Sequence, residues 1–274
     1  MRLTLAHSPD VDDAFMFYAL WGGLVHTGDL EFDEVRADIQ ALNERVMFGE
    51  YEVSAASCYA YARVSGRYVL STAGASVGDG YGPVLVAREV RLRRGRDCVI
   101  AVPGRNTTAC LVAQMWLPEA NIVSLPFEQI PQAVLEGHVA AGVLIHEAQL
   151  TYPESGLAKV VDLGEWWKAQ TGLPLPLGAV VMRRDLPLPL RKRIARAVRE
   201  SVRYALTHRE EALGAALKGA PALAQEHAGA FVSMYVNDFT LDLGERGRRG
   251  LERLFEEAYA GGLLPQMPTI ELVG

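Results

Sequence analysis

The stretch "TGLPLPLGAVVMRRDLPLPL", residues 171–190, decides the fold, because it joins a proline- and leucine-rich segment to an apolar strand and then to a long cationic helix. An earlier stretch, "REVRLRRGRDCVIAVPG" at residues 88–104, leaves one series of βαβ units through a basic, glycine-containing turn. Two such passages predict that the chain crosses twice between two lobes. We expect a large α/β lobe of residues 1–90 plus 178–274, and an inserted smaller α/β lobe of residues 91–177.

Short apolar or alternating runs recur along the chain, and segments with helical spacing lie between many of them. Examples are "LTLA", "YEVSAAS" and "AAGVLI" for strands, and "VDDAFMFYALWGGL" for a helix. Strands that alternate with helices predict α/β units around largely parallel sheets. In the helix expected after residue 187, one apolar stripe contains Ile194, Val198, Val202 and Leu206.

The composition limits the classes of partner. The 274 residues are 50% hydrophobic and carry a formal net charge of -6, so no basic surface for nucleic acid is expected. No apolar run approaches the roughly 20 residues that span a bilayer, so we expect no membrane partner. The start "MRLTLAHSPD" lacks the features of a secretory signal, and Cys58, Cys98 and Cys110 lack metal-ligand spacing. A cytoplasmic protein without a metal fits these features, and nothing indicates its oligomeric state.

The stretch "HSPDVDDAF" predicts a turn from a strand into a helix. Ser8, Asp10 and Asp12 are all good N-cap residues, and capping alone would explain them. Three carboxylates suggest a metal site, but the twelve-position calcium loop is missing. The functional alternative is that this turn opens into a cleft, where Ser8 and the turn amides contact ligand oxygens.

Two further strand ends have residues suited to a ligand. "VSAAS" ends in small residues that let a ligand approach the backbone, where Ser57 can donate a hydrogen bond, although Ser57 is equally suited to cap a helix. "VPGRNTTA" leads through a Pro-Gly turn to Thr107 and Thr108 at a helix start. The free amides there suit a carboxylate, with a plain threonine cap as the alternative.

The stretch "AAGVLIHEAQL" places His146 at the end of an apolar strand. It resembles the start of the zinc motif His-Glu-x-x-His, but Leu150 occupies the position of the second histidine, which excludes that site. Glu147 is adjacent in sequence and is therefore a poor orienting partner. The carboxyl ends of strands carry the ligand sites of open α/β sheets, so His146 is a candidate general base, with a structural histidine as the alternative.

Five stretches, "AHSPDVDDAFMFYAL", "VPGRNTTA", "LIHEAQLTYP", "VVDLGEWWKAQTGLPLPLGA" and "YVNDFTLDLGERG", together resemble the 1,4-dihydroxy-6-naphthoate synthase family of the futalosine route to menaquinone. The resemblance implies a two-lobed fold like that of type II periplasmic binding proteins, with two crossover segments and a cleft between the lobes. It also implies a lyase that converts cyclic dehypoxanthinylfutalosine to 1,4-dihydroxy-6-naphthoate and dihydroxyacetone without a metal or redox cofactor.

The resemblance assigns roles to particular residues. The catalytic base of the family falls on His146, and its ligand-binding segments fall on Ala55, Ala56 and Ser57 and on Thr107, Thr108 and Ala109. Many members carry Ser-Pro-Cys-Pro-Asn-Asp near the start, whereas this chain reads "SPDVDD". The contacts of Asp10, Asp12 and Asp13 are therefore not predicted.

Three other functions compete with this one. The sister enzyme chorismate dehydratase shares the fold, but no base is expected at the position of His146. A non-catalytic protein that binds a small carboxylate for transport would need an export signal. The effector-sensing half of a transcription regulator would need a helix-turn-helix segment before the first strand.

Overall fold

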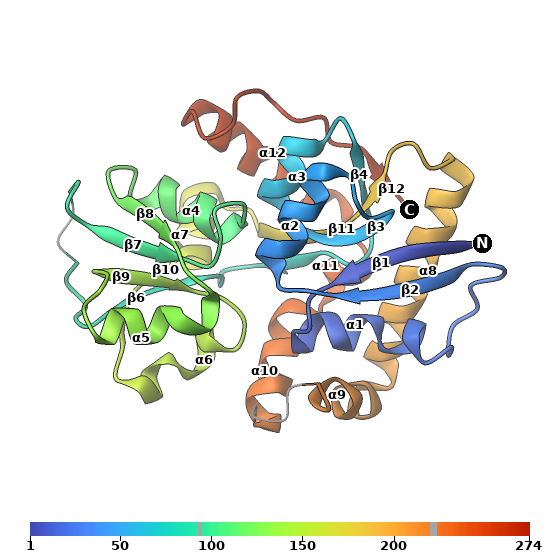
Figure 1. The fold of residues 1–274 in the computed structure, drawn as a ribbon, viewed down its shortest axis with the longest axis horizontal. Helices are drawn as coiled ribbons and strands as arrows, with labels where there is room; N and C mark the ends of the chain where they lie inside the picture. The colour runs from blue at the N-terminus through green and yellow to red at the C-terminus, as the bar shows by residue number, and fades with distance from the viewer. Residues whose placement is uncertain (93–94, 220–223) are drawn as a thin grey trace.

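The computed structural model describes residues 1–92, 95–219 and 224–274 and contains two β-sheets side by side, each covered by helices (Figure 1). Residues 93 and 94 of the first predicted crossing lie outside the described residues. The larger sheet has the order β12 (Leu272–Val273), β4 (Tyr68–Ser71), β11 (Leu175–Arg183), β3 (Val53–Ser57), β1 (Arg2–His7) and β2 (Glu31–Arg36), with β5 (Ser76–Gly78) paired to β11. The smaller sheet has the order β10 (Ala158–Asp162), β6 (Val84–Ala87), β9 (Ala141–Leu144), β7 (Val99–Val102) and β8 (Asn121–Ser124).

Both sheets are mixed, which corrects the expectation of largely parallel sheets. In the larger sheet β1 runs parallel to β2 and β3, but β11 is antiparallel to its neighbours β3, β4 and β5. In the smaller sheet β7 runs parallel to β8 and β9, but β6 is antiparallel to β9 and β10. β6 and β11 are the first strands after the chain has crossed from the other sheet. Because each starts at the edge where the parallel strands end, each must run in the opposite direction.

Helices cover both faces of each sheet, as expected of an α/β protein (Figure 1). One face of the larger sheet packs against α1 (Val11–Trp21), α8 (Leu188–Thr207) and α10 (Gln225–Tyr235), and α9 (Arg209–Leu217) packs on these helices. The other face packs against α2 (Ile39–Phe48), α3 (Cys58–Val64) and α12 (Gly244–Ala260). The smaller sheet packs against α4 (Thr108–Trp116), α5 (Ile130–Leu135) and α7 (Leu163–Thr171). The remaining short helices are α6 (Ala148–Thr151), α11 (Asp238–Leu241), η1 (Phe127–Gln129) and η2 (Tyr152–Ser155).

Alternate side chains of a strand enter the cores on opposite faces of its sheet. In β4, Tyr68 and Leu70 enter the core beneath α3 and α12, whereas Val69 enters the core beneath α1 and α8. The predicted apolar stripe of α8 is confirmed, because Ile194, Val198 and Val202 are buried and Leu206 packs partly buried against the same core. Exposed faces of that helix carry Lys192, Arg193, Arg196 and Arg203, whereas the Arg191 side chain is largely buried beside Glu271.

Helix ends follow from local sequence. Asp38 caps α2 by accepting from the amides of Gln40 and Ala41, and Asp162 caps α7 by accepting from Gly164 and Glu165. The two helices end at Gly49 and Gly172, which adopt left-handed φ values of 76° and 71°. These ends fix where the next strands begin.

β6 belongs to the smaller sheet, whereas the predicted division placed its residues in the large lobe. Residues 84–87 were expected in the first lobe, but β6 pairs with β9 and β10 in the smaller sheet. β6 and β7 belong to the same sheet, so the chain does not pass to the other sheet between them, and the first predicted crossing is wrong. The periodicity of a strand does not show which sheet it joins. We propose that the crossings lie at residues 79–83 and 172–174, between β5 and β6 and between α7 and β11.

Within the described ranges, no helix has the length and apolarity needed to cross a membrane. All three cysteines are buried free thiols.

Candidate active site

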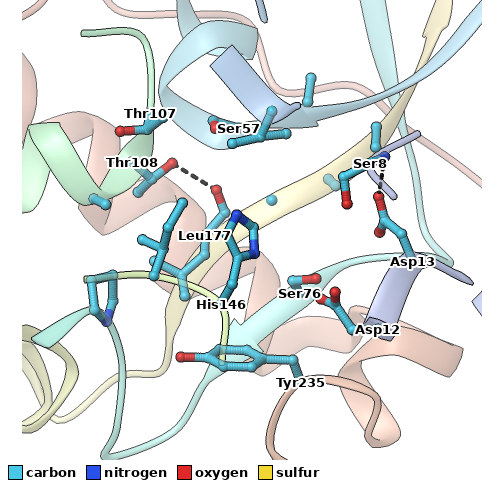
Figure 2. Close-up of a pocket in the computed structure, with 18 of the residues that line it drawn as sticks. Ser8, Asp12, Asp13, Ser57, Ser76, Thr107, Thr108, His146, Leu177 and Tyr235 are labelled. Atoms are coloured by element: carbon cyan, nitrogen blue, oxygen red, sulfur yellow. Dashed lines mark hydrogen bonds between the residues drawn. The ribbon is translucent and has the colours of Figure 1, made fainter. Parts of the chain in front are cut away.

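A cavity lies between the two sheets, at the edge where β1, β3, β7 and β9 end. The structure brings every predicted site residue to this cavity, namely Ser8, Ala55, Ala56, Ser57, Thr107, Thr108, Ala109 and His146. In Figure 2, His146 lies between Ser57 and Thr108 on one side and Asp12 and Tyr235 on the other. Loops that follow different strands thus converge on one enclosed space.

One end of the cavity has donors for an anion. The Ser57 hydroxyl accepts from Asn43 Nδ2 at 2.9 Å, and the Ser57 amide donates to Asn43 Oδ1 at 2.8 Å. Ser57 occupies the N-cap position of α3, but its side chain makes no capping bond there. Since the Ser57 oxygen already accepts from fully buried Asn43, its own O–H is left to donate into the cavity.

The threonine pair contributes in another way. Thr107 caps α4, since its hydroxyl accepts from the Cys110 amide at 3.1 Å and donates to the Gly104 carbonyl at 2.7 Å. The Thr108 hydroxyl donates to the Leu177 carbonyl at 2.7 Å (Figure 2). Both hydroxyl protons are therefore occupied. The amides of Thr108 and Ala109 have no acceptor within the described part of the chain, so the start of α4 offers these N–H groups to an anion.

The His146 ring is held from several sides. Its Nδ1 lies 3.3 Å from Asp10 Oδ2, and the Phe127 ring meets it edge-on with 4.8 Å between centroids. Within the described part of the chain, its buried Nε2 has no hydrogen-bond partner. The backbone φ of His146 is 55°. His146 is the only non-glycine residue with a left-handed φ in the described ranges. Such conformations cost about 1–3 kcal/mol and cluster at functional sites.

Gln149, three residues after His146, holds this strained turn. The Gln149 side-chain amide lies 2.8 Å from the Tyr235 hydroxyl. With its nitrogen donating to the Gly82 carbonyl at 2.5 Å, its oxygen accepts from the His146 amide at 3.2 Å. The backbone of His146 is thereby connected to Gly82, in the proposed crossing at residues 79–83, and to Tyr235 on α10.

Carboxyl groups line the opposite wall of the cavity. The pKa of Asp12 is raised well above its ordinary value by burial and by the nearby carboxylates of Asp13 and Asp10. Burial also raises the pKa of Asp13, although His7 and the Ser8 amide, 2.8 Å from Asp13 Oδ2, oppose that shift. Asp12 thus favours the protonated acid. An acid and an imidazole that line one cavity can carry out proton transfers.

Burial of Asp12 predicts a dependence of stability on pH. Because the pKa of Asp12 is higher in the folded chain than in the unfolded chain, the contribution of Asp12 to stability is lost as pH rises above about 4. We expect Asp12→Asn to be more stable than wild type at pH 7 by about 1 kcal/mol or more, since the amide mimics the neutral acid. Urea unfolding at pH 4 and pH 7 measures this. A gain that is no larger at pH 7 than at pH 4 contradicts the prediction.

Several cavity residues have no signal in the sequence. Phe231 and Tyr235 lie on α10, far along the chain, and Leu177 and Gly178 lie on β11. Asp10 contacts the cavity residue His146 without lining the cavity itself; it occupies the N-cap position of α1 but makes no capping bond, so capping does not explain it. No hydrogen bond or ion pair joins Glu147 to the His146 ring in the described ranges. Nor do these ranges contain three His, Cys, Asp or Glu residues placed to share a metal ion.

The two sheets, the crossings and the cavity between them define an α/β protein of the periplasmic-binding-protein class. The alkanesulfonate-binding protein SsuA from Xanthomonas axonopodis pv. citri superposes with a TM-score of 0.75 at 11% identity, covering 99% of this chain and 98% of that chain. At this identity the similarity shows the fold alone, and it confirms the predicted fold class.

Sequence comparison narrows the class to a family. A family model described as "Menaquinone biosynthesis" matches residues 3–260. The 1,4-dihydroxy-6-naphthoate synthase of Thermus thermophilus is 43% identical over 97% of both chains, and that of Streptomyces coelicolor is 39% identical over 97% of this chain and 95% of its own. The chain therefore belongs to the 1,4-dihydroxy-6-naphthoate synthase family of menaquinone biosynthesis, and the predicted resemblance is confirmed. A solved structure from Archaeoglobus fulgidus is 46% identical with a TM-score of 0.92, covering 96% of this chain and 98% of that chain.

Proposed function

We propose that this enzyme is a lyase that converts cyclic dehypoxanthinylfutalosine to 1,4-dihydroxy-6-naphthoate and dihydroxyacetone, with His146 as general base. The observation that carries the proposal is the buried His146 Nε2, which has no partner in the described ranges and belongs to a residue that lines the cavity. A nitrogen in this position can remove a proton from carbon beside a ketone. Fragmentation of the resulting enolate leaves an aromatic ring, which favours the products.

The proposal places the substrate carboxylate at the start of α4. The Ser57 hydroxyl and the amides of Thr108 and Ala109 are donors without a competing acceptor in the described chain, and the end of a helix dipole adds positive potential. The small side chains of Ala55 and Ala56 leave room for a ring against β3. His146, on the other sheet, then faces the carbon skeleton. The expected cytoplasmic location and the absence of a cofactor remain predictions.

Removal of the Ser57 hydroxyl tests the carboxylate position. We expect Ser57→Ala to raise KM about 10-fold with little change in kcat, since a hydrogen bond to a charged group contributes about 1.5–3 kcal/mol. Ser54→Ala is the matched control, because the Ser54 hydroxyl donates to the Ala55 carbonyl and does not line the cavity. Steady-state kinetics of both variants give the comparison. Equal KM values for the two variants contradict the assignment.

Conversion of the substrate by the purified protein tests the proposed reaction. We expect cyclic dehypoxanthinylfutalosine to disappear while 1,4-dihydroxy-6-naphthoate and dihydroxyacetone appear in equal amounts, as followed by chromatography. Chorismate, the substrate of the sister enzyme, serves as the comparison. Turnover of chorismate, or tight binding of the substrate without turnover, contradicts the proposal and supports one of the competing functions.

A further inference from the structure

We infer that Asp10 is a positioning residue that holds the His146 ring with its proton on Nδ1, so that Nε2 is free to act as the base. This inference rests on the proposed role of His146. It starts from the distance of 3.3 Å between Asp10 Oδ2 and His146 Nδ1, in a place where both side chains are largely buried, with exposed fractions of 9% and 13%.

The Asp10 side chain is free for this role. Asp10 stands at the N-cap position of α1 with a φ of -65° and a ψ of 156°, the backbone of a capping residue, yet its carboxylate accepts no helix amide. Its backbone performs the local tasks instead, since the Asp10 carbonyl accepts from Ala14 at 2.9 Å and the Asp10 amide donates to Ser8 Oγ at 3.3 Å. The carboxylate is directed to His146.

The contact favours one tautomer of the imidazole. A carboxylate accepts and cannot donate, so its approach to Nδ1 favours the ring that carries its proton on that nitrogen. In the neutral ring the other nitrogen, Nε2, then carries the lone pair. Nε2 is the atom that is buried in the cavity wall without a partner among the described residues. The arrangement parallels the buried carboxylate that orients the histidine of serine proteases.

Other charged groups near the ring are less suited to this role. Glu147 makes no hydrogen bond or ion pair with the ring in the described ranges, and burial raises the pKa of Asp12, which favours its neutral form. Tyr235 bonds to Gln149, and burial raises its pKa well above the ordinary value, so it stays a neutral phenol. The Asp10 carboxylate is thus the anion that faces Nδ1.

The contact also joins the two sheets. Asp10 follows β1 of the larger sheet, whereas His146 follows β9 of the smaller sheet. The base is therefore oriented by a group that follows a strand of the other sheet, and its orientation requires the two lobes to be in the arrangement seen here. A separation of the lobes would remove the partner of Nδ1.

A double-mutant cycle tests whether Asp10 acts through His146. We expect Asp10→Ala to lower kcat about 100-fold with KM nearly unchanged, because a carboxylate of this kind works through the tautomer and orientation of the ring. In a His146→Asn background the same substitution should change kcat less than about 2-fold. Asp38→Ala, which removes the cap of α2, is the matched control for loss of an N-cap aspartate and should leave kcat unchanged.

Nitrogen NMR of histidine-labelled protein gives a readout that does not depend on turnover. We expect neutral His146 to carry its proton on Nδ1 in wild type, and Asp10→Asn to show a mixture, since an amide can present either oxygen or nitrogen to the ring. A wild-type ring protonated on Nε2 overturns the inference. An equal fold-loss of kcat from Asp10→Ala in the wild-type and His146→Asn backgrounds also overturns the inference. Near-normal turnover by His146→Asn, with the Nδ1 proton present, contradicts only the proposed base.

Discussion

His146→Asn should lower kcat roughly 1,000-fold, in the middle of the range that a positioned general base contributes. Asparagine is the suitable replacement because the backbone at this position has a φ of 55°, and asparagine tolerates the left-handed region better than alanine. The substitution therefore removes the base without adding backbone strain. Single-turnover formation of 1,4-dihydroxy-6-naphthoate measures the chemical step.

Binding should survive the same substitution. The proposed donors to the carboxylate, Ser57 and the start of α4, lie on other elements, so we expect the product to bind His146→Asn within about 3-fold of wild type. His138→Asn is the matched control, because the His138 side chain is exposed and outside the cavity. If His146→Asn turns over like His138→Asn, His146 is not the base.

The second large effect is on stability, and it concerns the proposed crossing at residues 79–83. A Cβ atom on Gly164 would lie 2.0 Å from the carbonyl carbon and oxygen of Tyr81 and 2.4 Å from the Gly82 nitrogen. These are backbone atoms, which cannot rotate away. We therefore expect Gly164→Ala to destabilise the protein by about 3 kcal/mol, the upper part of the range for overpacking, and to lower Tm by roughly 6–12 °C.

The control for this experiment lies on α9. A Cβ atom on Gly214 would have no described atom within 4 Å, so Gly214→Ala should stabilise the protein by up to about 1 kcal/mol through the helix preference of alanine. Calorimetry of the two variants compares the same chemical change in two settings. A melting temperature for Gly164→Ala equal to that of wild type contradicts the close approach at the crossing.

The close approach at Gly164 matters for the site as well. The Gly82 carbonyl accepts from the Gln149 side chain, whose oxygen holds the His146 amide. A shift of Tyr81 and Gly82 by the added methyl group would therefore reach the turn that carries the base. We expect Gly164→Ala to lose activity in addition to stability, whereas Gly214→Ala keeps both.

The sequence could predict the residues at strand ends, because the carboxyl ends of parallel strands meet at one edge. Ser57 is the last residue of β3, and Thr107 and His146 come after β7 and β9. All three residues line the cavity. Neither the sheet that β6 joins nor its antiparallel direction was predictable from its pattern. A short apolar run has the same periodicity in either sheet and in either direction. Two-residue β12 and three-residue β5 are too short to show any period.

The partner of His146 could not be predicted from local rules. Asp10 has every local property of a helix cap, and only the placement of the two sheets brings its carboxylate to His146. Tyr235 and Phe231 reach the cavity because α10 packs beside α1, a contact between segments about 200 residues apart in sequence that no short-range signal encodes.

The central claim is that the substrate lies with its carboxylate at the start of α4 and its reacting carbon at His146 Nε2. A crystal structure of His146→Asn with cyclic dehypoxanthinylfutalosine tests it most directly, because we expect the variant to bind the substrate and to turn it over roughly 1,000-fold more slowly. We expect the carboxylate on the Ser57 hydroxyl and the Thr108 and Ala109 amides, with the carbon beside the ketone about 3–3.5 Å from the side chain at position 146. A carboxylate bound elsewhere, or a reacting carbon out of reach of position 146, would contradict the claim.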